Sequence, residues 1–243
     1  MDLEFYNEEK HDYFLDTFTD YSREPTEEEE EFFRPELEQI VEDISEVTGQ
    51  SDDFKLYYAM TDEDALDDDL PINRYVHGFS FAEWMEGFDR DVVMIRAVND
   101  REDWRPCLVN MLAHEMAHQE YYSKNKTAPY TNLQNLVFEG HAMNRAEQVA
   151  EELDLEWSPH YRSEEPPEID SGAIIQVLDK NRNQGSEDIF SNGGELCEQA
   201  EGYQIAYLTV DYLVNEKDIG LGELPGEESL REEVEEALTE VLN

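Results

Sequence analysis

Two histidines and a glutamate near the middle of the chain have the spacing of a metal site. Residues 112–118 read LAHEMAH, an H-E-x-x-H motif inside a long helical pattern. Residues i and i+4 of a helix share one face, so the imidazoles of His114 and His118 can meet at a single ion. Glu115 is rotated by about 100° from His114 and would stand beside the ion. The motif therefore predicts a zinc site in which Glu115 is the general base for a bound water.

A catalytic zinc of this kind needs a third protein ligand, and Glu139 is the first of two candidates. Counting about six residues from His118 to the end of its helix and about seven from Asn132 to Glu139, at 1.5 Å per residue, gives about 10 Å for each. An antiparallel helical hairpin would therefore bring Glu139 level with His118. His141 is also chemically suitable, but it points about 200° away from Glu139 on the same helix, so the two cannot share one ion.

These elements together resemble the gluzincin pattern of metallopeptidases. More specifically, the chain is similar over roughly residues 75–225 to a domain-of-unknown-function family described as predicted Zn-dependent proteases. The matching segments are Asn99-Asp100, His114 to His118, EGHA at 139–142 and GYQIAY at 202–207. The chain departs from that family at His141, where a small apolar residue is more usual, and at Ala206, where glycine is expected. The resemblance implies a zinc-dependent protease.

A peptidase of this type also needs a hydrogen-bond donor directed at the developing oxyanion. Tyr203, in a helical pattern from about Glu195 to Val214, is the first candidate, and Tyr207, one turn further on, is the second. A tyrosine on an amphipathic helix is at least as often a core residue. The choice between the two stays open.

The chain carries a large excess of negative charge. It has 62 Asp and Glu against 17 Lys and Arg, a formal net charge of −45 over 243 residues. High charge can indicate disorder, but 13 Tyr, 11 Phe and 3 Trp supply core material. The chain could also be an acidic partner of a basic protein or a nucleic-acid mimic, but mimicry would concentrate the acids on one face, whereas here they occur along the whole chain. Adaptation to multimolar salt, where the screening length falls to about 3 Å or less, is favoured, and no nucleic-acid partner is expected.

The sequence predicts neither secretion nor a membrane span. Its first residues show no basic region followed by an apolar one, and no apolar run approaches the length of a spanning helix. Cys107 and Cys197 have no C-x-x-C partner and are expected to be reduced and not to bind metal. We expect a cytoplasmic protein whose substrate is a peptide or a protein.

Apolar periodicity predicts an α+β chain that is mainly α-helical. Helices are expected over residues 3–20, 26–48, 104–124, 131–153, 171–178, 195–214 and 227–242, and strands over 54–60, 75–80 and 91–97. We predict a single zincin-like domain over residues 1–243. Residues 1–100 would form helices and a small sheet packed beside the H-E-x-x-H helix, and residues 101–243 the helical metal-binding and C-terminal part. His77 is expected in a strand or loop, without a metal role.

The expected function is hydrolysis of peptide bonds by a zinc metallopeptidase with a His₂Glu site. Two alternatives remain. The first is a zinc hydrolase that acts on another amide or an ester, and a panel of substrates would distinguish it from a peptidase. The second is a non-catalytic acidic interaction protein that carries the motif by chance, and such a protein would contain no stoichiometric zinc.

Overall fold

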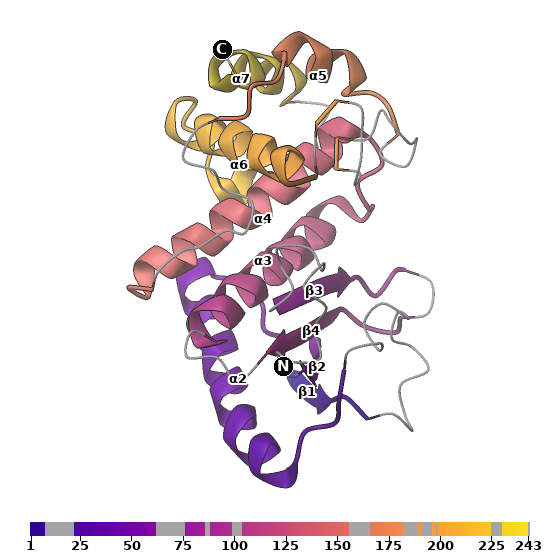
Figure 1. Ribbon diagram of the computed structural model, residues 1–243, viewed down its shortest axis with the longest axis vertical. Helices are drawn as coiled ribbons and strands as arrows, with labels where there is room; N and C mark the ends of the chain where they lie inside the picture. The colour runs from indigo at the N-terminus through magenta and orange to yellow at the C-terminus, as the bar shows by residue number, and fades with distance from the viewer. Residues whose placement is uncertain are drawn as a thin grey trace. The chain divides into compact units, whose positions relative to one another are not determined.

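The chain is α+β and mostly helical in the computed structural model (Figure 1). The structure describes residues 1–7, 22–61, 76–85, 88–98, 104–155, 166–181, 189–190, 196–197, 199–224 and 230–242. The chain forms two compact units: the first is Met1–Glu120 with Ala146–Ser158, and the second is Tyr121–Arg145 with Pro159–Asn243. The long helices α3 (Trp104–Asn125) and α4 (Asn132–Glu152) each contribute residues to both units.

The first unit contains a four-stranded sheet in the order β1-β2-β4-β3. Its strands are β1 (Asp2–Phe5), β2 (Lys55–Thr61), β4 (Val92–Val98) and β3 (Val76–Phe81). The first three run parallel, and β3 pairs antiparallel with β4 at the edge. The three strands predicted from the sequence are confirmed, each displaced by about one residue, which is the usual uncertainty of an element boundary.

Strand β1 contradicts the helix predicted over residues 3–20. Leu3 and Phe5 are buried and Glu4 between them is not, which is the period of a strand. Leu3 lies opposite Leu56 and Phe5 opposite Tyr58 in the parallel register. The prediction was wrong because four residues are too few to separate the two periods, and pairing with a distant strand decided the outcome. Residues 8–21 of that predicted helix lie outside the described residues.

Helices α2 (Glu27–Thr48) and α3 pack on one face of the sheet (Figure 1). A capping box between Thr26 and Glu29 begins α2, and Gly49, with φ of 69°, ends it. Both ends agree with the sequence signals, since Ser or Thr with Glu three residues on favours a helix start and glycine a helix end. The largest fully buried side chains between helices and sheet are Leu37, Ile40, Ile44, Leu56, Tyr58, Met60, Ile95, Leu108, Leu112 and Met116.

The second unit is helical within its described residues. It holds the end of α3, the first part of α4, α5 (Ser171–Val177), α6 (Gln199–Asn215), the short 3-10 helix η3 (Leu221–Glu223) and α7 (Arg231–Leu242). The start of α4 is fastened to the end of α5, because the side-chain amide of Asn132 donates to the carbonyl oxygen of Val177 at 3.0 Å. Cys197 was predicted to lie in a helix, but it lies just before α6, where its thiol donates to the carbonyl oxygen of Ile189.

No described helix has both the length and the apolar character needed to cross a bilayer. The Asn99-Asp100 segment, which the family resemblance includes, lies outside the described residues, as do residues 227–229 of the last predicted helix.

Candidate metal centre

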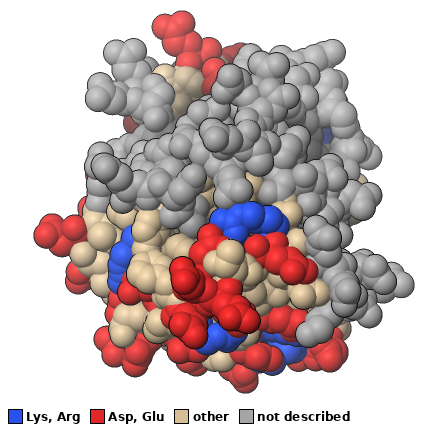
Figure 2. All heavy atoms as spheres, turned by 60° about the horizontal axis from the view of Figure 1, so that its bottom comes forward, with Lys and Arg blue, Asp and Glu red and all other residues tan. Residues whose placement is uncertain are grey.

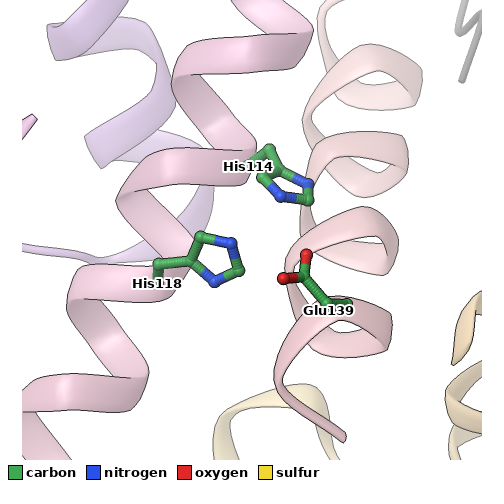
Figure 3. Close-up of side chains that lie close together, drawn as sticks. All are labelled: His114, His118 and Glu139. Atoms are coloured by element: carbon green, nitrogen blue, oxygen red, sulfur yellow. The ribbon is translucent and has the colours of Figure 1, made fainter. Parts of the chain in front are cut away.

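The three predicted ligands lie together. His114 and His118 from α3 and Glu139 from α4 each offer one ligand atom, and these atoms all lie within 4.8 Å of one another (Figure 3). Among the described residues this is the only group of three or more His, Cys, Asp or Glu side chains that meets this condition. The group contains Glu139 and not its rival His141, in agreement with the hairpin arithmetic.

Helical geometry places the two histidines. Their spacing of four residues brings the ring centroids to 4.6 Å, with the ring planes at 83°. His118 and Glu139 are buried, with 6% and 9% of their surface exposed, while His114 is half-buried. A buried carboxylate is costly unless it is paired, so an ion or a proton held between these groups would stabilise the arrangement.

Aromatic packing in the second unit sets the register of the helical hairpin. The ring of Phe138, the residue before Glu139, lies edge-on to Tyr121 at 5.0 Å and tilted against Tyr122 at 5.4 Å. Tyr122 is one helical turn after His118. This packing therefore fixes the position of Glu139 along the end of α3. The lengths of the two helices and their turn alone do not fix it.

Glu115 is buried, with 4% of its surface exposed, and lies against the edge strand β3. The hydroxyl of Ser80 donates to the carbonyl oxygen of Glu115 at 2.7 Å. The side-chain amide of Gln119 donates to the carbonyl oxygens of Phe81 and Val92, at 3.1 and 2.9 Å. Sequence reasoning did not find Ser80 or Gln119, because a hydrogen bond between residues that are far apart in the chain leaves no local pattern.

The glycine of the E-G-x-A element has a packing role in the second unit. A Cβ at Gly140 would lie 2.2 Å from the carbonyl oxygen of Ala206, so glycine is required for α4 and α6 to approach this closely. The amide of Asn144 donates to the carbonyl oxygens of Gly140 and Tyr207, at 2.8 and 3.2 Å. These contacts fix α4, the helix that carries Glu139, against α6. The close approach is made with alanine at position 206, where the family resemblance leads us to expect glycine.

The predicted oxyanion donors both lie on α6. Tyr203 is half-buried, and its ring lies edge-on to Phe190 at 5.3 Å. Tyr207 is buried, and its carbonyl oxygen accepts the hydrogen bond from Asn144. Neither contact involves the three candidate ligands, so the oxyanion role stays a prediction.

His77 lies on β3 opposite Arg96. Burial, and then the positive charge of Arg96, lower the pKa of His77 to about 4 from its ordinary value of 6.5. His77 is therefore neutral at neutral pH. Its ring packs on Phe79 at 4.6 Å.

The donor set fits zinc better than a hard cation. Zinc is commonly held by two imidazole nitrogens and a carboxylate oxygen, with a fourth position open in catalytic sites. Calcium and magnesium prefer oxygen ligands throughout. Two histidines and one glutamate on two helices are thus a donor set that suits zinc.

Comparison with known proteins identifies the family. No curated protein and no solved structure matched the chain. The sequence model of a family described as "Predicted Zn-dependent protease (DUF2268)" matches residues 70–224, more than half of the chain. The matched range includes β3, the H-E-x-x-H helix, Glu139 and α6. The chain therefore belongs to the DUF2268 family of predicted Zn-dependent proteases.

Proposed function

We propose that this protein is a zinc-dependent metallopeptidase that hydrolyses peptide bonds, with zinc held by His114, His118 and Glu139. The observation that carries the proposal is that these three ligand atoms, from two helices, lie within 4.8 Å of one another, with Glu115 next to His114 in the sequence. The family description supports both the zinc and the proteolysis. The substrate is a peptide or a protein.

A zinc ion in this site would lower the pKa of a water molecule and polarise the scissile carbonyl group. Glu115 accepts the proton of the attacking water and later donates it to the leaving amine. Its burial against β3 limits the positions that its carboxylate can take. Tyr203 donates a hydrogen bond to the oxyanion.

The test is the substitution Glu115→Gln, which keeps the shape of the side chain and removes its basicity. Peptide hydrolysis should fall by about 10²- to 10⁴-fold, the usual contribution of a general base, while bound zinc stays near one equivalent. Glu38→Gln, an equal change of charge at an exposed position of α2, is the control and should keep full activity. A fully active Glu115→Gln variant would contradict the mechanism.

A panel of peptide, other amide and ester substrates tests the reaction class. Faster hydrolysis of a peptide than of matched amides and esters supports a peptidase. Activity confined to a non-peptide amide or an ester would keep the zinc site and replace the substrate class. Purified protein without stoichiometric zinc would contradict the proposal as a whole.

We further propose that the protein works in a cytoplasm of multimolar salt. Figure 2 shows Asp and Glu side chains over much of the described surface on one face, with Lys and Arg set among them. Arg90 contacts Asp2 at 3.2 Å and Asp53 at 3.4 Å, so one cation serves two acids. Surface charge of this density repels itself in dilute buffer and is screened at high ionic strength.

A further inference from the structure

The backbone of Gly78, on the edge strand β3, forms the surface against which Glu115 lies. A Cβ built on Gly78 would lie 2.6 Å from Cγ, 2.7 Å from Oε1 and 2.9 Å from Cδ of Glu115. Real Cβ atoms essentially never approach other heavy atoms this closely. Position 78 therefore accepts a side chain only if Glu115 moves.

The backbone conformation does not explain a glycine here. Among the described glycines only Gly49 has a positive φ, so the conformation of Gly78 is open to any residue. Glycine inside a strand is less favourable than alanine, because it loses more conformational freedom on folding. What glycine provides at this position is space for the side chain of Glu115.

Two further contacts prevent the helix from retreating. The hydroxyl of Ser80, two residues along β3, donates to the carbonyl oxygen of Glu115. Gln119, one turn further along α3, donates to the carbonyl oxygen of Phe81 at the end of the same strand. Because strand and helix are fastened on this side, an added methyl group at position 78 would displace the side chain of Glu115 from Cγ onward rather than the helix.

We propose that Gly78 is a positioning residue for the general base. Because Gly78 has no side chain, the carboxylate of Glu115 can lie against the strand backbone. This inference rests on the proposed function for the role of Glu115, but the contact itself does not depend on it. Gly78 takes no part in the reaction itself and acts only through Glu115.

The first test is the variant Gly78→Ala with Gly220→Ala as its control. Misplacing a reacting group by about 1 Å costs about 10²-fold in rate, so kcat should fall by that order while KM and zinc content stay unchanged. At Gly220 a Cβ would meet no atom nearer than 3.6 Å, so that variant should keep full kcat. A Gly78→Ala variant with the kcat of the wild type would overturn the proposal.

The second test measures the contact without any reaction. In the Glu115→Ala background the obstructing atoms are gone, so Gly78→Ala should raise Tm, as alanine does where glycine has no packing role. In the wild-type background the same substitution should lower Tm or raise it less. Equal shifts in both backgrounds would overturn the proposal.

Folding failure is informative in this design. If Gly78→Ala alone does not fold and the double variant with Glu115→Ala does, the clash with Glu115 is demonstrated. If Glu115→Ala alone folds and neither variant with Gly78→Ala does, position 78 conflicts with something other than Glu115 and the proposal is wrong. A folded wild-type protein that hydrolyses no peptide would refute the proposed function, while the Tm comparison would still decide whether Gly78 and Glu115 are coupled.

Discussion

The side-chain amide of Gln119 donates a hydrogen bond to the carbonyl oxygen of Val92 at 2.9 Å. Gln119 is the residue after His118, and Val92 begins the strand β4. The same amide reaches Phe81 at the end of β3. One side chain thus ties the H-E-x-x-H helix to two strands at the position next to a candidate ligand.

Replacing Gln119 with leucine should therefore loosen the helix. The substitution leaves two carbonyl oxygens without their donor, and an unsatisfied buried group costs about 1–3 kcal/mol. We expect a loss of this size in the free energy of unfolding, measured with urea at fixed salt, together with weaker zinc binding. Gln39→Leu on the exposed face of α2, where the amide reaches only Asp43, should cost much less. Equal losses for both variants would contradict the role of Gln119.

Zinc should stabilise the wild-type protein. At a free concentration of about 100 times Kd, a ligand that binds only the folded state adds about 2.7 kcal/mol, which corresponds to a rise in Tm of about 5–10 °C for a chain of this size. His118→Ala and Glu139→Ala should lose this rise, and His141→Gln should keep it. Scanning calorimetry of each apo variant with and without zinc measures the effect. A rise that depends on His141 and not on Glu139 would replace the proposed ligand set.

The lowered pKa of His77 predicts a loss of stability in acid. Its pKa is 6.5 when unfolded and about 4 when folded, so between these values the unfolded chain binds more protons and protonation favours unfolding. The contribution of His77 to the free energy of unfolding is constant above about pH 6.5. It falls as the pH approaches 4, by up to about 3 kcal/mol.

His77→Gln removes that contribution to the pH dependence. Unfolding free energies from urea titrations at pH 7.5 and 4.5, in the same salt, should differ by less for the variant than for the wild type. If both proteins lost the same unfolding free energy between pH 7.5 and 4.5, His77 would not contribute to the pH dependence, and its pKa would not be lowered by folding.

The negative surface should make folding depend on salt. Glu38, Glu42 and Glu46 are exposed on α2 at successive spacings of four residues, where like charges destabilise a helix by about 0.2–0.5 kcal/mol per pair. Dialysis from multimolar to millimolar KCl should reduce the helical circular dichroism of the wild type. Glu42→Lys converts two repulsive pairs into attractive ones, so its unfolding midpoint should move to lower KCl, with Glu42→Gln between the two. A wild-type spectrum that does not change with KCl would contradict salt adaptation.

Local patterns explain the parts of the fold that were predicted correctly. Thr26 with Glu29 and Gly49 mark the ends of α2, because a capping box and a left-handed glycine act within a few residues. The short turn between α3 and α4 made an antiparallel hairpin the expected arrangement, so counting residues predicted that Glu139 lies near His118, as their ligand atoms do. Strand β1 was not predicted because it is stabilised by pairing with β2, which begins about 50 residues further along the chain.

The sequence by itself determined that His114 and His118 share a helix face, since a spacing of four residues closes one turn in any helix. It also determined the net charge and the acidic character of the surface. Only the tertiary structure decided which atoms surround Glu115, because Gly78 and Ser80 reach it across more than thirty residues of chain. Periodicity reports the neighbours of a residue along its own element, and contacts between elements depend on how their surfaces pack.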